Sequence, residues 1–298
     1  YIEADYWDMF APVFRPYRDR LVLAAHWGSA NHPGIARCRE RFDDVLARAG
    51  KGYAEVGMMT MVDEERDWHG WAQESIAQLQ RYKERGRIGA IGMSGHNPAT
   101  AMHAVRSGLI DVLMFPINMV GHGDEELAAL YQACTDQGVG LVAMKVYNGG
   151  TLFTASGKPS GITPAHCLAY VLSLPVATTV PGPKNAEEMG ATLHYLEASE
   201  AEKDYRPVVG NLRERLAGQC VYCHHCLPCP EGIEMGWLIW HVDQTLARSV
   251  EELKASYAGF PAKGSTCTAC GVCLERCPFG VDIPAKMRRA AELFEAQV

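Results

Sequence analysis

The chain has 298 residues, a formal net charge of −7 and 48% hydrophobic residues. This length accommodates one large domain and one small domain, and the mild acidity gives no indication of a nucleic-acid partner. No segment resembles a signal peptide, and no apolar run is long enough to span a bilayer.

Apolar strand-like runs alternate with amphipathic stretches over the first two thirds of the chain. The predicted strands are Tyr1–Ala4, Leu21–Ala25, Glu55–Thr60, Ile88–Met93, Val112–Phe115, Val139–Met144 and Val176–Val180. Strand–helix repetition with short connections predicts an α/β fold with a parallel sheet and right-handed crossovers. Seven strands are visible, whereas a closed (β/α)8 barrel of the TIM type has eight. Because the chain begins inside a predicted strand and without a methionine, we expect a first strand and helix to precede it.

Helix start signals lie between these strands. Helices are predicted from Asn97-Pro98 to Ser107, after Asp124, from Thr163-Pro164 to Ser173, and from Asn185 to Glu197.

Two cysteine runs lie near the C-terminus. The first reads Cys220-Val-Tyr-Cys223-His-His-Cys226-Leu-Pro-Cys229-Pro230, and the second reads Cys267-Thr-Ala-Cys270-Gly-Val-Cys273-Leu-Glu-Arg-Cys277-Pro278. Three cysteines at two-residue gaps, then a fourth before a proline, form the pattern of bacterial two-cluster ferredoxins. The first run departs from this pattern because two residues, not three, precede its last cysteine.

The spacing predicts two [4Fe–4S] clusters with exchanged fourth ligands, because a tight loop reaches three iron corners of a cubane and the fourth ligand must come from elsewhere. We assign one cluster to Cys220, Cys223, Cys226 and Cys277. The other cluster takes Cys267, Cys270, Cys273 and Cys229. Paired Cys-x-x-Cys motifs also build tetrahedral zinc sites, but zinc needs only four sulfurs in two pairs, so the regular third and fourth cysteines favour iron.

Cysteine usage also bears on domains and compartment. Eight of the 11 cysteines lie in the last third, so the composition changes near Leu216. We expect a barrel over residues 1–215 and a small helical ferredoxin-like domain over residues 216–298. Reduced thiols and clusters indicate the cytoplasm. The remaining cysteines lie in apolar surroundings and are interpreted as buried thiols: Cys38, Cys134 and Cys167.

Three segments resemble the aldo-keto reductase family. Ile88-Gly-Ala-Ile-Gly-Met-Ser94-Gly-His96 is similar to the segment of its fifth strand. Gly140-Leu-Val-Ala-Met-Lys145-Val-Tyr147 is similar to the seventh strand, and Val180-Pro-Gly182-Pro-Lys184-Asn185 to the eighth strand and the following helix. The cysteine runs resemble those of the ferredoxin-fused branch of that family. The resemblance implies a (β/α)8 barrel whose site lies on the loops after the strands.

The resemblance also implies where NADP(H) would bind. It places the adenosine phosphate at the turn containing Gly182, Lys184 and Asn185, where helix amides and a lysine charge favour an anion, although an ordinary capped helix start would look the same. It places Ser94 and His96 at the group that holds the nicotinamide amide. Tyr147 lies where its ring could stack on the nicotinamide, or could simply belong to the barrel rim.

The catalytic tetrad of the family differs here. The family uses Asp, Tyr, Lys and His to donate a proton to a carbonyl, with the Lys charge lowering the Tyr pKa. By resemblance, His26 occupies the lysine position, Thr60 the histidine position and Tyr6 the tyrosine position, whereas no residue matches the Asp. His26 could donate a proton near neutral pH or be a hydrogen-bonded rim histidine. Met114 stands where the family has a glutamine. The residues Trp27, Trp68, Trp71 and Met58–Met61 either line an apolar pocket or pack the barrel.

Electron counting limits the mechanism. Nicotinamide gives two electrons as a hydride, whereas each cluster accepts one, so an electron-transfer protein partner, a bound flavin or a small-molecule substrate that tolerates single-electron steps must complete the path. No flavin-specific motif is visible. We expect an iron–sulfur oxidoreductase; the alternatives are a non-catalytic electron-transfer subunit of a larger redox complex and an NADPH-dependent carbonyl reductase with structural clusters.

Overall fold

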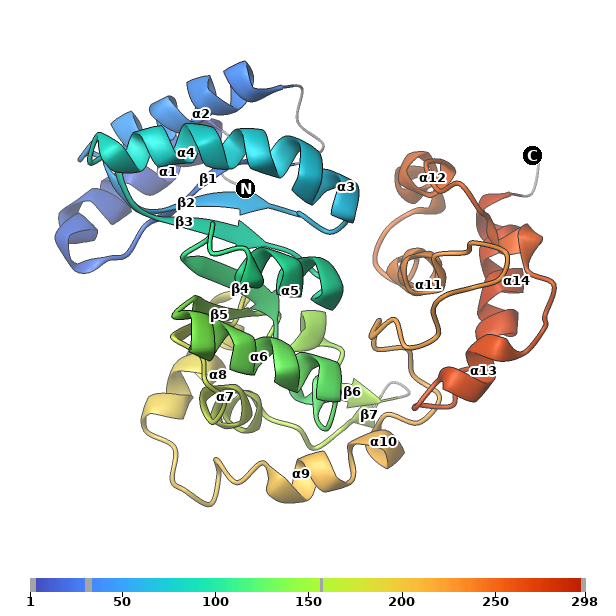
Figure 1. Ribbon diagram of the computed structural model, residues 1–298. Coiled ribbons are helices and arrows are strands. Elements are labelled where there is room, and N and C mark those ends of the chain that lie inside the picture. Colours follow the sequence, from blue (N-terminus) through green and yellow to red (C-terminus); the bar gives the residue numbers. More distant parts are fainter. Residues whose placement is uncertain (1–3, 30–33, 156–157, 296–298) are drawn as a thin grey trace. The chain divides into compact units, whose positions relative to one another are not determined.

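The computed structural model describes residues 4–29, 34–155 and 158–295 (Figure 1). Residue contacts divide the chain into two compact units. The first comprises Tyr1–Asn118, His122–Val146 and Leu168–Thr192, and the second comprises Met119–Gly121, Tyr147–Cys167 and Leu193–Val298. The expected domain boundary after residue 215 stays a prediction. No helix in the described part of the chain is long and apolar enough to cross a membrane.

A sheet of six parallel strands forms the centre of the first unit, and its strands follow one another in chain order. The strands are β1 (Ala24–Ser29), β2 (Ala54–Thr60), β3 (Ile88–Ser94), β4 (Val112–Pro116), β5 (Gly140–Met144) and β8 (Thr178–Val180). Chain-order neighbours in a parallel sheet require a crossover between each pair, which the helices supply. The predicted α/β fold is therefore confirmed.

The first two predicted strands do not coincide with strands in the described part of the structure. Residues 1–3 of the predicted strand Tyr1–Ala4 lie outside the described residues, and Ala4 begins helix α1 (Ala4–Phe14). The strand predicted at Leu21–Ala25 begins later, at Ala24. Leu21 and Val22 are 42% and 77% exposed, so the start of that apolar run is surface rather than sheet core.

Helices connect the strands and pack on the sheet: α2 contacts β1, α4 contacts β3 and α6 contacts β5 (Figure 1). The side chains of Asn97 and Asp124 accept hydrogen bonds from the first amides of α5 and α6, which confirms both predicted helix starts. The helix predicted after Asn185 ends at Leu193 and continues as a 3₁₀ turn over His194–Leu196. The longer helices between the strands, and those beside β8, are α2 (Ile35–Arg48), α4 (Gln73–Glu84), α5 (Pro98–Arg106), α6 (Glu125–Gln137), α7 (Pro164–Leu172) and α8 (Ala186–Leu193). Shorter segments are α3 (Glu65–Asp67), a π-helix (Trp68–Ala72), and 3₁₀ helices at Arg15–Arg20, Met119–Gly121, Asn148–Gly150 and Gly264–Thr266.

Aromatic rings fill the core beneath β1 and β2. The ring of Trp27 lies 5.4 Å from that of Phe42 and 5.7 Å from that of Tyr82, and all three side chains are buried. Trp68 and Met58 are also buried, at 2% and 1% exposure. These side chains therefore pack the fold, which settles the choice between packing and an apolar pocket for them.

The second unit carries the cysteine runs on a group of helices. Helices α11, α12 and α14 contact one another (Figure 1). Its elements are β6 (Thr154–Ala155), β7 (Lys158–Pro159), α9 (Arg206–Gly210), α10 (Leu212–Arg215), α11 (Met235–Gln244), α12 (Val250–Ala258), α13 (Val272–Arg276) and α14 (Ile283–Phe294).

Candidate functional site

The two cysteine runs adopt the same local conformation. Tyr222 and Ala269, each just before the second cysteine of its run, both have φ 55°, and the residues just after that cysteine, His224 and Gly271, have φ 63° and 85°. Left-handed residues are uncommon outside glycine, so their matched positions indicate that both loops are built to one geometry. Loops that include left-handed residues can turn successive amides toward a common centre, as at phosphate and iron–sulfur sites.

The likeness continues beyond the fourth cysteine of each run. Gly232 and Gly280, three residues after Cys229 and Cys277, have φ 68° and 62°, and their amides donate to the carbonyls of those cysteines at 3.0 and 3.3 Å. Helices α11 and α14 begin directly after these turns. The extra residue of the second run lies in α13, a short helix that contains the third cysteine of that run and ends just before the fourth. The departure in spacing is thus accommodated without changing the loops.

The cysteines line two cavities in the second unit. One cavity is lined by Cys220, Cys223, Cys226 and Cys277 and encloses about 340 Å³, part of it open to solvent. The other is lined by Cys229, Cys267, Cys270 and Cys273 and also by Cys226, and it has a volume of about 360 Å³, part of it open to solvent. Cys226 thus lines both cavities, and each cavity holds three cysteines of one run and the last cysteine of the other run.

Hydrogen bonds fasten the loops to the helices that follow them. Asp243 on α11 accepts from the Tyr222 hydroxyl at 2.9 Å and from Lys286 Nζ on α14 at 2.7 Å. Arg276 donates to the carbonyl of Pro228 at 2.9 Å, which joins the end of one run to the other. The amide of Val281 points at the sulfur of Cys277, 3.5 Å away. These contacts fix the loops that carry the cysteines relative to α11, α13 and α14.

The donor set fits an iron–sulfur cluster and also fits zinc, because four thiolates suit both. Burial, and then the nearby Cys223 sulfur, raises the pKa of Cys226 to about 12. Burial raises the pKa of Cys220 to about 12 as well. Buried thiols clustered in this way need bound cations to hold them as thiolates. The three cysteines outside the runs, Cys38, Cys134 and Cys167, are buried as expected.

Polar side chains meet at the carboxyl ends of strands in the first unit. Asp63, three residues after β2, accepts from the backbone amide of His96, and its carboxylate lies 3.1–3.2 Å from His96 Nδ1. Ser94 is buried at the end of β3, and its hydroxyl oxygen accepts from the amide of Met61 at 3.2 Å. Ser94 and His96, predicted to hold a nicotinamide amide, are therefore fixed by the loop after β2.

Lys145 contributes the positive charge near this group. It directly follows β5, has φ 54°, and its carbonyl accepts from the Asn118 side chain at 3.2 Å. Burial raises the pKa of Asp63, but hydrogen bonds from His96 and the charges of His96 and Lys145 outweigh it, so this pKa lies below its usual value. Desolvation lowers the pKa of Lys145 against the opposing charge of Asp63, although the residue keeps access to solvent.

Sequence analysis missed Asp63 and Lys145 as site residues. A signal was present, because both follow predicted strands within three residues and the carboxyl ends of parallel strands gather at one edge. Lys145 even lies inside a segment used for the family resemblance.

The predicted tetrad positions are arranged differently. The Thr60 hydroxyl donates to the carbonyl of Gly28 at 2.9 Å. Desolvation by the surrounding protein lowers the pKa of His26 to about 4, although the residue is exposed at the surface. Tyr6 lies in α1, and its side chain lies outside the described part of the structure. The proton-donating roles of His26 and Tyr6 stay predictions.

The turn expected to bind the adenosine phosphate is capped by an acidic side chain. Gly182 has φ 76°, Asn185 Oδ1 accepts from the amide of Glu188 at 2.9 Å, and Glu188 Oε2 accepts from the amide of Lys184 at 2.7 Å. Glu187 lies in the same first helical turn. A phosphate bound here would meet these carboxylates and would compete with Glu188 for the Lys184 amide.

Tyr147, the candidate nicotinamide-stacking residue, belongs to the second unit. It is 6% exposed, and its ring lies 5.2 Å from that of Phe153. One face of the side chain is therefore used in packing, and its stacking role stays a prediction.

Comparisons with known proteins cover most of the first unit and part of the second. Residues 8–165 match the model of the aldo/keto reductase family. The holo form of an aldo-keto reductase from Bacillus halodurans superposes with a TM-score of 0.53 at 16% identity, over 68% of this chain and 78% of that one. The apo form gives 0.51 at 16% identity, over 68% and 76%. An aldo-keto reductase from a Medee basin deep-sea metagenome gives 0.47 at 15% identity, over 67% and 77%. No curated protein matches the chain.

Proposed function

The chain belongs to the aldo/keto reductase family, and we propose that it is an iron–sulfur oxidoreductase that exchanges electrons between two [4Fe–4S] clusters and a site at the carboxyl ends of the sheet strands. The sheet is part of a (β/α)8 barrel in this proposal. The observation that carries it is that the eight regularly spaced cysteines line two cavities, and that each cavity holds three cysteines of one run together with the last cysteine of the other run.

The sorting favours iron over zinc for a geometric reason. Zinc sites need only two pairs of sulfurs, whereas each run here has three cysteines at two-residue gaps and a fourth before a proline. A cubane needs a fourth ligand that the tight loop cannot reach, and the exchange supplies it. The clusters would supply one-electron transfer at these cavities.

The site in the first unit would bind and orient the reacting molecule through groups that the chain holds in place. Asp63 fixes the ring and the backbone amide of His96, and the buried Ser94 hydroxyl keeps its hydrogen for an acceptor because its oxygen already accepts from Met61. Lys145 adds a positive charge where negative charge would develop on a reduced carbonyl. NADP(H) is the cofactor that family membership implies for this position.

A hydride donor gives two electrons at once, whereas each cluster accepts only one. The electron pair must therefore be split before it reaches the clusters. A bound flavin, a protein partner that carries electrons, or a substrate that tolerates single-electron steps would divide them. A reducing compartment such as the cytoplasm would suit the thiols and the clusters.

Family membership favours a second candidate, an NADPH-dependent carbonyl reductase whose clusters serve structure alone. The residues that replace the tetrad argue against it. Thr60 has its hydroxyl committed to Gly28, and His26 is neutral at pH 7 because its pKa is about 4. An ordinary proton relay to a carbonyl therefore lacks two of its groups.

An assay of the full chain with simple aldehydes separates these functions. We expect NADPH-dependent reduction to be slower by about a hundredfold to ten-thousandfold than with an intact tetrad, the usual contribution of general acid catalysis. Activity with a low-potential electron donor should require intact clusters. Rapid NADPH turnover by cluster-free protein would instead establish the carbonyl reductase, and tight association with another redox protein without turnover would establish an electron-transfer subunit.

A further inference from the structure

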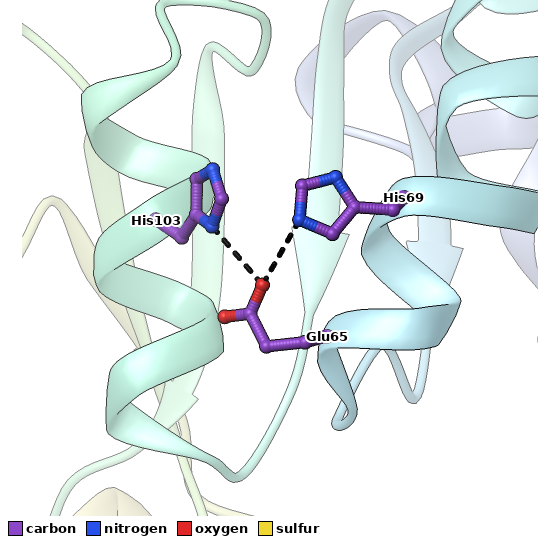
Figure 2. A group of neighbouring side chains, drawn as sticks. All are labelled: Glu65, His69 and His103. Carbon is purple, nitrogen blue, oxygen red and sulfur yellow. Dashed lines mark hydrogen bonds and ion pairs between the residues drawn. The ribbon is translucent and has the colours of Figure 1, made fainter.

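Three potential metal ligands converge on the surface of the first unit. Glu65 on α3, His69 in the π-helix and His103 on α5 place one ligand atom each so that all three atoms lie within 4.8 Å of one another. Figure 2 shows the carboxylate of Glu65 between the two imidazole rings. Its Oε2 atom lies 3.3 Å from His69 Nε2 and 3.1 Å from His103 Nδ1.

The segment that carries Glu65 and His69 is held rigidly. The two residues are four apart and span the junction between α3 and the π-helix (Trp68–Ala72), a rare helix form that often marks functional sites. Trp68 between them is 2% exposed and anchors this junction in the core. Its ring also lies 5.9 Å from that of His103, so the same anchor supports the third ligand.

Helix α5, which carries His103, is fastened to the chain just before α3. The Thr100 hydroxyl donates to the carbonyl of Asp63 at 3.1 Å, and Asn97 caps the start of the helix. Asp63 in turn holds the amide of His96. The three ligand atoms therefore come from one continuous segment, α3 with the π-helix, and from α5. Buried and hydrogen-bonded neighbours set the relative positions of these elements.

The spacing of these atoms suits a tetrahedral ion. Zinc binds imidazole nitrogen and carboxylate oxygen at about 2.0–2.2 Å, which separates neighbouring ligand atoms by about 3.4 Å in a tetrahedron. The two separations from Glu65 are close to that value. We propose that Glu65, His69 and His103 form a zinc site, with water in the fourth position. Two imidazoles with one carboxylate and an open position form a ligand set that zinc enzymes use.

The site differs in chemistry from the cysteine cavities. Nitrogen and oxygen donors at an exposed position accept a borderline cation such as Zn²⁺, whereas the sulfur cavities select iron–sulfur clusters or zinc. Bound zinc would replace the hydrogen bond between Glu65 and His103 and the contact between Glu65 and His69, and it would join α3 to α5 by coordination. Since Asp63 lies two residues before Glu65, the ion would also stiffen the loop that fixes His96.

Zinc titration of anaerobically purified full-length protein, with its clusters in place, tests this site. We expect the wild type to bind one more equivalent of Zn²⁺ than His69→Ala or His103→Ala. Glu65→Gln should weaken that binding at least about tenfold, since it removes the charged ligand. All three side chains are exposed, so the variants should fold, which circular dichroism would verify.

His194→Ala is the matched control. His194 is an exposed histidine with a single carboxylate, Glu202, at 3.1 Å, so it resembles each ion pair of the site but lacks a third ligand. Its substitution should leave Zn²⁺ binding unchanged. Co²⁺ bound at the proposed site should show no sulfur-to-metal charge-transfer band. Equal Zn²⁺ binding by the wild type and His103→Ala, or equal loss in His194→Ala, would overturn the proposal and leave Glu65 with ion pairs alone.

Discussion

Thr60 and His26 stand at the predicted tetrad positions, but neither has a proton that it could readily donate to a substrate carbonyl. The Thr60 hydroxyl donates to the Gly28 carbonyl at 2.9 Å, so its hydrogen is used within the sheet. Desolvation keeps the His26 imidazole neutral by lowering its pKa to about 4. A neutral imidazole at pH 7 can hydrogen-bond to a substrate but has no imidazolium proton to give.

The titration of His26 is a first prediction. Its resonance, identified by its loss in His26→Gln, should stay unchanged from pH 7.5 to about 5 and titrate near pH 4. Because the unfolded chain would take up this proton near pH 6.5, the folded state loses stability as the pH falls from about 6.5 toward 4. An NMR titration with a midpoint near 6.5 would contradict the desolvated environment.

Glu188 gives a second prediction at the start of α8. Glu188→Gln keeps an oxygen for the Lys184 amide but removes a negative charge that a phosphate would face. The repulsion between one exposed charge and a neighbouring phosphate raises the free energy of binding by about 1 kcal/mol. Without that charge, NADPH should bind about threefold to tenfold more tightly. NADH, which lacks the adenosine phosphate, is the control and should change little. An unchanged dissociation constant for NADPH, measured by fluorescence, would place its phosphate elsewhere.

At the scale of helices and strands, those that a local sequence pattern specifies were predictable from the sequence. Strand periodicity located β2, β3, β4, β5 and β8 but not the short strands β6 and β7. The caps Asn97 and Asp124 located two helix starts, because each signal lies within a few residues. The cysteine spacing likewise encodes the loops, since ligand geometry demands it. The nearness of Asp63 to Lys145 was not predictable from local pattern, because it arises only when strands that are distant in sequence are placed in one sheet. The convergence of Glu65 and His103 was not predictable for the same reason.

The exchange of fourth ligands gives the third prediction. Cys229→Ser should damage the cluster in the cavity of Cys267, Cys270 and Cys273, and Cys277→Ser should damage the other cluster. The reason is that each cavity takes its fourth cysteine from the opposite run. Paramagnetic resonance of the two reduced variants separates the clusters, and Cys134→Ser, at a buried cysteine outside the runs, is the control. If each substitution instead damaged the cluster held by the other three cysteines of its own run, the proposed pairing would be wrong.

At the scale of the whole molecule, one chain combines two compact units to which we assign different roles. The first unit supplies the parallel sheet and the fixed polar groups Ser94, His96 and Lys145, and the second supplies the sulfur cavities. The family was predictable from three segments because strand ends carry its motifs, and residues 8–165 confirm it. The substrate was not predictable, because it depends on the space that loops from several strands enclose together.

Metal and sulfide analysis of anaerobically purified full-length protein tests the central claim most directly. Two cubanes bring about eight irons and eight acid-labile sulfides per chain, and we predict both values, with a brown colour that dithionite bleaches. The Cys134→Ser variant should give the same content. Stoichiometric zinc in the cysteine cavities with no acid-labile sulfide would contradict the account, because the runs would then be structural zinc sites without a redox role.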